Sequence, residues 1–381
     1  MAKKKVLLIL HYPPPIHGAG IMGDIIRKSE RLKEEFHTRT IKIDSSVELH
    51  DIGRMSLKKV WLTLKFVIRV FWVVLAFRPN KVHYFSSSQG IAFYRDYLVS
   101  LSFKFLKVFN DLSIYYHYQA KYRLTKNWEM TISKWYFKNA SIVVLSKELI
   151  EDFKVLPFWK KLSFYILPNT CKNLVSDDEF KSSLFFKNEL DIVNFLYLSN
   201  MIPSKGYLEV LDVARYLNEK KVQALFSFAG DWMTKEDEEK FLKIVKELNL
   251  QNMIHIHGRV NDIQKKQLLS RAHFLIFPTR YPNEAFPLVL VEALQFGVLP
   301  ITYINGGTPS IVNDNLGMLI KDNSLESLKN TALFASKRDR YMEKAFNARD
   351  KYLNDYRLFH FEKKLIDILN KEIEPVNLNN L

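Results

Sequence analysis

Short apolar runs alternate along the chain with longer stretches of helical periodicity. In the first half the strand-like runs cover residues 5–11, 39–44, 81–85, 113–117, 141–145 and 164–167. After a polar stretch, the alternation restarts with runs at 194–198, 224–229, 254–257, 274–277, 299–302 and 317–320. Strands that alternate with helices are typical of parallel, doubly wound sheets. We therefore predict an α/β protein.

The polar stretch predicts where the chain divides. The 381 residues exceed what one hydrophobic core accommodates, so we expect two domains. The first covers 1–170, a linker covers 171–190, and the second covers 191–355. Apolar residues at helical spacing predict a C-terminal helix in 356–381, which we expect to pack back toward the first domain. The cleft between two such domains is the expected ligand site.

Charge is distributed unevenly between the two halves. Residues 1–170 contain 28 Lys and Arg against 13 Asp and Glu, whereas residues 171–381 contain 28 of each. The net charge of +15 therefore belongs to the first half, which we expect to face a polyanion such as anionic lipid, nucleic acid or an acidic substrate. General lysine enrichment is the alternative. The single cysteine, Cys171, excludes an intrachain disulfide framework.

The segment 60–77 is long and apolar enough to resemble a membrane span. Lys65 and Arg69 lie near its middle, and each would cost roughly 2.5–3.5 kcal/mol there, so we predict that it does not span. Two alternatives stay open: a core helix, or a helix at a membrane interface. The interfacial reading rests on basic flanks and aromatic side chains, namely Arg54, Lys58, Lys59, Arg78, Trp61, Phe66, Phe71 and Trp72.

Two glutamates, Glu284 and Glu292, stand eight residues apart around the start of an apolar, helix-like run. The first amides of a helix have no partner within it, so those of Phe286 and Leu288 are expected to face an anion. Pro287 fits this position because its missing N–H is not needed there. The alternative is a helix N-terminal acid and a solvated glutamate, but the run around Glu292 is too apolar for an outer face.

The stretch 284–293 resembles the E-x7-E motif of the retaining GT-B glycosyltransferases of glycosyltransferase family 4. Further landmarks of that family are resembled, in family order, by 195–206, 228–231, 256–260, 306–309 and 315–317. The resemblance implies a GT-B fold, with two Rossmann-like domains that face a cleft. It also implies transfer of a sugar from a nucleotide diphosphate donor to a carbohydrate or lipid-linked acceptor, with retention of anomeric configuration, as in bacterial surface polysaccharide assembly.

The resemblance also implies roles for single residues. Glu292 would bind the ribose hydroxyls of the donor, and Glu284 would face the donor sugar near the reacting carbon. Lys205 would pair with the diphosphate. The backbone of Phe286, Pro287 and Leu288 would assist the leaving phosphate.

The sequence departs from the family pattern at one position of this site. The family has Gly-Arg where this chain has Ser199 and Asn200, so an arginine contact to the diphosphate is missing. We expect Asn200 to donate a neutral hydrogen bond, or Arg259 to compensate. Arg259 and Val260 belong to the loop that resembles the family's base-contacting loop.

In the first half, a glycine loop follows the first strand. Gly18 and Gly20 belong to a G-x-G-x-x-G pattern, and Asp44 follows at the distance expected for a dinucleotide fingerprint. The prolines at 13–15 weaken this reading, because they separate the strand from the first glycine where a tight turn is needed. The resemblance instead implies that this loop lies near the donor phosphates.

His117 closes a strand whose carboxyl end is expected to face the same cleft. A single strand-end histidine is more often a structural hydrogen-bonding residue, but the resemblance implies a position near the sugar and a catalytic role. Arg95 and Asp96 either serve the acceptor or form a buried ion pair. We predict no metal site and no cofactor beyond a nucleotide-sugar co-substrate such as a UDP- or GDP-sugar.

The expected partners are the donor, a glycan or lipid-linked acceptor and an anionic membrane surface. We expect a cytoplasmic protein, with peripheral attachment to the inner face of the cytoplasmic membrane. Two other classes stay open: an NAD-dependent oxidoreductase, for which the glycine loop speaks, and a basic nucleic-acid-binding protein. The latter lacks a recognised binding motif.

Overall fold

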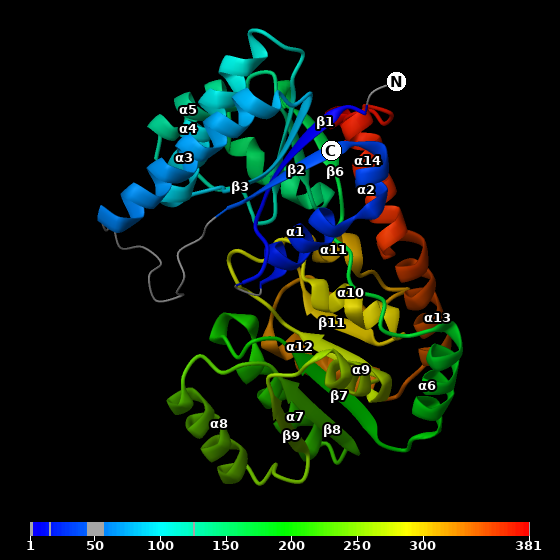
Figure 1. Ribbon diagram of the computed structural model, residues 1–381. Helices are drawn as coiled ribbons and strands as arrows, with labels where there is room; N and C mark the ends of the chain where they lie inside the picture. The colour runs from blue at the N-terminus through cyan, green and yellow to red at the C-terminus, as the bar shows by residue number, and fades with distance from the viewer. Residues whose placement is uncertain (1–2, 15–16, 44–56, 125, 381) are drawn as a thin grey trace. The chain divides into compact units, whose positions relative to one another are not determined.

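The computed structural model describes residues 3–14, 17–43, 57–124 and 126–380 (Figure 1). Two compact units make up the chain. Unit 1 contains Met1–Asn169 and Phe359–Leu381, and unit 2 contains Thr170–Leu358.

Unit 1 is built on a six-stranded sheet in the order β2-β1-β3-β4-β5-β6, and all its pairings are parallel. Its central strands are buried on both faces, as expected where helices cover a parallel sheet. The strands are β1 Lys5–Leu10, β2 His37–Lys42, β3 Lys81–Ser86, β4 Ser113–Tyr118, β5 Ser141–Val144 and β6 Ser163–Ile166. The helices are α1 Gly18–Lys28, α2 Glu30–Glu35, α3 Leu57–Phe77, α4 Gly90–Lys107, α5 Trp128–Phe137 and α14 Leu358–Asn370, with 3₁₀ turns at Lys147–Val155, Trp159–Lys161 and Leu378–Asn380.

Unit 2 repeats this architecture with a parallel sheet in the order β12-β11-β10-β7-β8-β9. The strands are β7 Val193–Leu198, β8 Ala224–Ala229, β9 Ile254–Gly258, β10 Phe274–Phe277, β11 Leu299–Tyr303 and β12 Met318–Ile320. The helices are α6 Asp177–Glu189, α7 Tyr207–Glu219, α8 Lys235–Glu247, α9 Asp262–Arg271, α10 Leu288–Gln295, α11 Thr308–Ile311, α12 Leu325–Ala335 and α13 Tyr341–Lys351, with a 3₁₀ turn at Pro203–Lys205 and a π-helical turn at Tyr352–Tyr356. The predicted α/β class with two doubly wound parallel sheets is confirmed.

The predicted linker at 171–190 is mostly helical. Residues Asp177–Glu189 form α6, whose N-terminus carries a capping box in which Ser176 and Glu179 bond each other's backbone amides. Phe180 and Leu184, four residues apart, are buried. This stretch therefore forms a packed helix of unit 2 instead of a linker.

The C-terminal helix α14 packs within unit 1. Phe361, Leu365 and Ile368 lie on its buried face. The ammonium group of Lys81 donates to the carbonyl of Leu369, which also accepts from the Tyr115 hydroxyl at 3.4 Å. Because strands β3 and β4 supply these donors, the end of α14 is tied to the sheet of unit 1.

Helix α3 is apolar but largely exposed. It is the helix of the described chain that is long and apolar enough to cross a membrane by length and composition, and only 22% of Val60–Phe77 is buried. One stripe, formed by Phe66, Val70, Val74 and Phe77, packs inward. A fully buried core helix is therefore not observed. Of the basic flank, Arg54 and the side chains of Lys58 and Lys59 lie outside the described residues.

Gly23 lets α1 pack closely against the end of β1. A Cβ atom at this position would lie 1.8 Å from the carbonyl oxygen of His11, whereas one at Gly18 would meet nothing within 4 Å. We expect Gly23→Ala to lower the free energy of unfolding by about 3 kcal/mol or more, because backbone must move. Gly18→Ala should stay within about 1 kcal/mol of the wild type. Urea denaturation checks this, and equal losses in both variants would contradict it.

Candidate functional site

Lys205 and Glu284 meet where the strand order of unit 2 reverses. Lys205 follows β7 and Glu284 follows β10, and these two strands are neighbours in the sheet although they are not consecutive in sequence. Such a switch point, at the carboxyl ends of parallel strands, is the usual ligand position in α/β sheets. The Lys205 Nζ lies 3.4 Å from the Glu284 Oε2, and both side chains are mostly buried.

The two loops that carry this ion pair are held close together. Gly206 has φ +87°, and a Cβ atom there would lie 2.6 Å from the Pro278 carbonyl oxygen. The Arg280 amide donates to the Ser204 carbonyl at 2.8 Å. The Lys205 ammonium also lies 5.4 Å from the centre of the Tyr281 ring. Glycine is therefore needed at 206 for both its backbone conformation and this close approach.

Glu284 retains unused hydrogen-bonding capacity. Its Oε2 is buried and accepts no hydrogen bond among the described residues, although the ammonium of Lys205 lies nearby. Buried carboxylate oxygens are ordinarily satisfied, so one that is not indicates a place where a hydroxyl group can donate. A sugar hydroxyl is a suitable donor.

Glu292 lies on helix α10 and also forms an ion pair. Its Oε1 accepts from the Lys265 ammonium at 2.7 Å, and both side chains are mostly buried. Burial raises the pKa of Glu292, a shift that Lys265 opposes. Lys265, on α9, was not predicted from the sequence, because nothing distinguishes it there from the neighbouring Lys266. Lys265 holds a negative charge in place inside unit 2.

Helix α10 begins close to Glu284. Pro287 is its N-cap, no side chain caps this end, and Phe286 is buried while Leu288 is half-buried. The carbonyl of Ala285 accepts from the Gly307 amide at 2.7 Å, which joins this loop to the turn after β11. The positive end of the α10 dipole is therefore available to an anion.

The other residues predicted for the donor lie in loops after β7 and β9. Arg259 is exposed and lies 3.7 Å from the Asp231 carboxylate, and Val260 follows it directly. Asn200 is exposed, and its carbonyl accepts from the Tyr197 hydroxyl at 3.2 Å. The backbone amide of Ser199 donates a hydrogen bond to the carbonyl of Ala229. That Asn200 or Arg259 replaces the missing arginine stays a prediction.

The glycine loop of unit 1 opens α1 as expected. His17 is the N-cap, and its Nδ1 accepts from the Gly20 amide at 3.1 Å. Burial, followed by Arg95 and His17, lowers the pKa of the adjacent His11 to about 3, so this ring is neutral. An anion that binds the Gly20 amide would have to displace the His17 ring, whereas Gly18 has open space around it.

His117 belongs to a buried chain of side chains. Asn169 Nδ2 donates to Gln119 Oε1 at 3.1 Å, and Gln119 Nε2 lies 3.0 Å from His117 Nε2. His117 Nδ1 lies 3.2 Å from His83 Nε2. Since the amide nitrogen of Gln119 can only donate, His117 Nε2 accepts and the His117 proton is on Nδ1. The Nδ1–H of His117 then donates a hydrogen bond to His83 Nε2, and the proton of His83 is on its own Nδ1.

Two atoms at the ends of this chain are left without partners. His83 Nδ1 and Asn169 Oδ1 are buried and make no hydrogen bond among the described residues. Both nitrogens of His117 are used, so a contact between its ring and a sugar requires Gln119 to move. Sequence reasoning did not find His83, Gln119 or Asn169, because their contact depends on strand pairing.

Arg95 and Asp96 form a buried ion pair, which decides between the two readings left open above. Asp96 is fully buried and accepts from the Tyr84 hydroxyl, the Ser87 amide at 2.6 Å and the Arg95 guanidinium at 2.7 Å. These groups fix the start of α4 against β3. A carboxylate satisfied this fully acts as a structural anchor.

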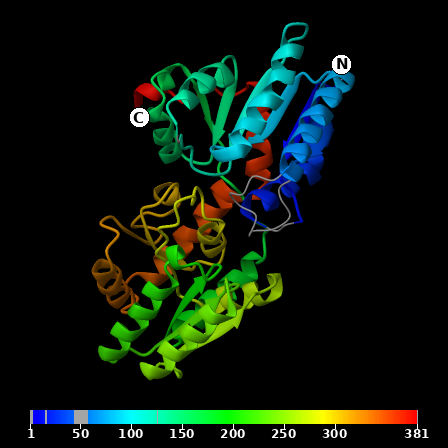
Figure 2. The same ribbon diagram turned by 90° about the vertical axis from the view of Figure 1, so that its left-hand side faces the viewer.

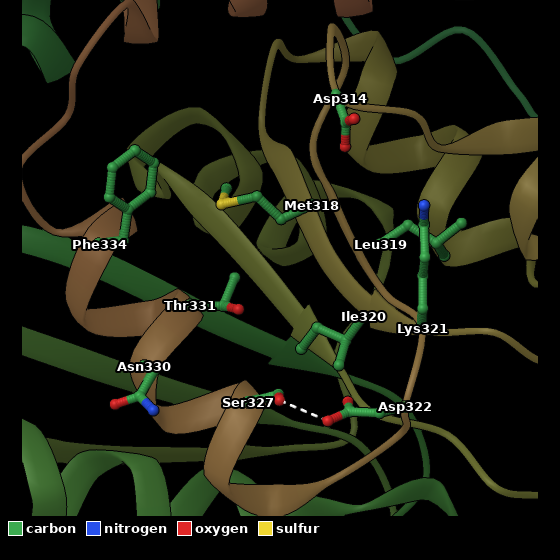
Figure 3. Close-up of a pocket in the computed structure, with 10 residues that line it drawn as sticks. All are labelled: Asp314, Met318, Leu319, Ile320, Lys321, Asp322, Ser327, Asn330, Thr331 and Phe334. Carbon is green, nitrogen blue, oxygen red and sulfur yellow. Dashed lines mark hydrogen bonds between the residues drawn. The ribbon is translucent and has the colours of Figure 1, made fainter.

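A separate cavity of about 570 Å³ lies beside the edge strand β12 and helix α12 (Figure 3). Its lining includes Met318, Thr331 and Phe334, and it includes none of the predicted site residues. Asp322, at its rim, accepts from Ser327 at 2.6 Å, so this carboxylate serves the start of α12. The described residues contain no group of three or more His, Cys, Asp and Glu side chains that could hold a metal ion.

The neutral histidines predict how stability depends on pH. Burial lowers the pKa of His83 to about 3, and burial followed by His83 lowers the pKa of His117 well below its usual value. In the unfolded chain both titrate near 6.5, so stability present above that pH is lost as pH falls from about 6.5 toward 3. We expect His83→Gln to make this loss shallower by up to about 1.4 kcal/mol per pH unit.

Urea denaturation of the wild type and His83→Gln at several pH values between neutral and acidic gives this slope. Glutamine keeps polar atoms in the chain but cannot take up a proton in this range. Parallel curves for the two proteins would contradict the assignment of a neutral, buried His83.

Comparison with known proteins gives one matching family model and several similar folds. Residues 177–350 match the family model of the glycosyl transferases group 1. A glycosyltransferase from Rickettsia africae superposes with a TM-score of 0.73 at 16% identity, over 97% of this chain and 98% of that chain. Anabaena HepE in complex with UDP superposes with a TM-score of 0.71 at 15% identity, over 97% of this chain and 100% of that chain.

A third similar structure is WaaG, a glycosyltransferase involved in lipopolysaccharide biosynthesis, with a TM-score of 0.64 at 18% identity over 96% of this chain and 99% of that chain. The search of curated proteins gives no match. At these identities the solved structures establish the fold, which is GT-B. Residues 177–350, which make up most of unit 2, are the part of the chain that resembles the glycosyl transferases group 1.

Proposed function

We propose that this protein transfers a sugar from a nucleoside diphosphate sugar, bound by unit 2, to a carbohydrate or lipid-linked acceptor, bound by unit 1. The observation that carries the proposal is the ion pair of Lys205 and Glu284 at the switch point beside the start of α10. It combines a cation for phosphate, a helix N-terminus and a carboxylate with a free acceptor site. The family match supports the reaction class.

The donor nucleotide is proposed to lie along α10. Lys205 and the first amides of α10 compensate the charge of the diphosphate, which grows as the sugar leaves. Glu292 bonds the ribose hydroxyls through Oε2, because Lys265 occupies Oε1. The UDP and UDP-glucose bound to Anabaena HepE support a nucleoside diphosphate sugar and make uridine the first base to test.

The chemical step breaks the bond between the anomeric carbon and the phosphate oxygen, and it forms a bond from that carbon to an acceptor hydroxyl oxygen. The proton of the acceptor hydroxyl passes to the departing phosphate, so the products are a nucleoside diphosphate and a glycoside. Glu284 binds a hydroxyl of the transferring sugar, and His117 acts on the same sugar once Gln119 has moved away from its Nε2. Attack on the face from which the phosphate leaves gives retention of configuration.

The acceptor is proposed to be a lipid-linked glycan of a surface polysaccharide, and the site of action is proposed to be the cytoplasm. The charge of residues 1–170 supports an anionic acceptor or surface. The role of the similar WaaG in lipopolysaccharide biosynthesis supports the same acceptor class. The family match leaves the oxidoreductase and nucleic-acid-binding readings without support.

Separate roles for the two glutamates make this proposal testable. Glu292→Gln and Lys205→Ala should each weaken nucleotide binding by about 1–3 kcal/mol, since each removes charge-assisted hydrogen bonds. Glu284→Gln and His117→Ala should bind free nucleotide nearly as the wild type does, but should release nucleoside diphosphate from the donor at least about tenfold more slowly, or about 1.4 kcal/mol. Calorimetry with UDP and a UDP-release assay with UDP-glucose measure the two effects.

Glu236→Gln, on the exposed face of α8, is the matched control and should change neither quantity. Unaltered nucleotide affinity in both Glu292→Gln and Lys205→Ala, with the fold intact, would refute the donor site. If Glu284→Gln lost binding and turnover together, Glu284 would have a structural role instead.

A further inference from the structure

We propose that unit 1 docks on an anionic lipid bilayer through an exposed apolar surface of α3 and α4. This inference goes beyond the proposed reaction and needs no assumption about it. We call the surface the α3–α4 platform. Its members share an exposed apolar side chain on these helices or directly after them: Trp61, Leu64, Ile68, Trp72, Leu101, Phe105, Val108 and Phe109.

The platform is a continuous face. On α3, residues 61, 64, 68 and 72 fall on one side of the helix, opposite the stripe that packs inward. Aromatic contacts join α3 to α4: the Trp72 and Phe71 ring centres lie 6.0 Å apart, those of Phe71 and Phe105 lie 6.2 Å apart, and those of Phe105 and Phe109 lie 5.4 Å apart. Helices α3 and α4 lie side by side in both views (Figures 1 and 2).

Exposure of this kind needs an explanation. The side chains of Trp61, Trp72 and Phe109 are 60%, 64% and 69% exposed. Single exposed apolar residues are ordinary, but a contiguous apolar surface on a protein marks an interaction site. A helix this apolar is normally buried, yet only 22% of Val60–Phe77 is buried in α3.

Cations border the platform. Lys65 and Arg69 lie on α3 about 55° and about 95° around the helix from the centre of the apolar stripe, at about 100° per residue. The Lys65 ammonium lies 5.2 Å from the centre of the Trp61 ring. On α4, the Lys104 ammonium lies 4.6 Å from the centre of the Trp135 ring. Apolar side chains next to cations fit the acyl and headgroup layers of an anionic bilayer, and tryptophan favours that boundary.

Charge decides between the possible occupants. A second copy of this chain would bring two surfaces from the half that holds the entire net charge of +15 against each other, whereas anionic headgroups complement it. The inward stripe of α3 packs within unit 1, so spanning the bilayer would strip Phe66, Val70 and Val74 of their contacts. The helix therefore lies in the plane of the surface.

The test uses the full chain and two matched triple variants. The platform variant carries Trp61→Ser, Trp72→Ser and Phe109→Ser. The control variant carries Phe185→Ser, Met233→Ser and Phe334→Ser, which replace apolar residues of unit 2 with similar exposure. Circular dichroism and thermal unfolding verify that both are folded. Co-sedimentation then compares vesicles of phosphatidylcholine alone with vesicles that also contain phosphatidylglycerol.

We expect the wild type and the control variant to pellet with the anionic vesicles and not with phosphatidylcholine alone. The platform variant should bind at least about tenfold more weakly, a loss of about 1.4 kcal/mol. Lys65→Gln with Arg69→Gln should weaken binding as well, and its residual binding should depend less on salt, because the Debye length falls from about 10 Å at 0.1 M to about 3 Å at 1 M.

Brominated lipids distinguish insertion from adsorption to the headgroups. They should quench the tryptophan fluorescence of the wild type, and this quenching should be lost in the platform variant. The proposal is overturned if the folded platform variant binds like the wild type, or if the wild type binds neither kind of vesicle. It is also overturned if the wild type is a dimer without lipid and the platform variant a monomer, since a second copy would then be the occupant.

Discussion

Parallel strand pairing is the constraint on which the site in unit 2 depends. In a parallel sheet every connection crosses over, so the loops that follow the strands all emerge at one edge. The chain places β7 beside β10 and β10 beside β11, and the loops after these three strands carry Lys205, Glu284 and Gly306. Residues about eighty positions apart in sequence, such as Lys205 and Glu284, therefore become neighbours and form an ion pair.

Buried charge is then the second feature of the site. Glu292 and Lys265 keep a carboxylate inside unit 2 where burial alone would favour its neutral form. Removing one member of such a pair leaves an uncompensated charge and costs about 3–5 kcal/mol. Glu292 thus keeps a carboxylate that can accept hydrogen bonds, while Lys205 and the start of α10 supply the opposite charge in the same unit.

The sequence predicted the strands to within about two residues at most ends, because buried parallel strands are nearly continuous apolar runs. It also singled out Lys205 and Glu284, which the structure places in contact, and Glu292, which lies on the helix α10 that begins four residues after Glu284. Helix α6 was not predicted within 171–190, because the stretch is mostly polar and only a few of its residues, among them Phe180 and Leu184, are buried apolar ones.

Partners that depend on tertiary packing had no sequence signal. Lys265 and the chain from Asn169 to His83 come from separate elements, and periodicity reports only which face of an element is apolar. For the same reason the pattern of α3 left open whether protein or another surface covers its outer face. Burial in the folded chain was needed to decide that the protein covers only one stripe.

The central claim is that unit 2 binds a nucleoside diphosphate sugar. The most direct measurement is the thermal stability of the whole chain in the presence of UDP-, GDP- and ADP-sugars, NAD and a short oligonucleotide. A ligand that binds only the folded state stabilises it, by about 2.7 kcal/mol at a ligand concentration of a hundred times the Kd, and so raises the unfolding temperature. We predict such a rise with at least one nucleotide sugar and none with NAD or the oligonucleotide. A rise with NAD, or with none of the nucleotide sugars, would contradict the account.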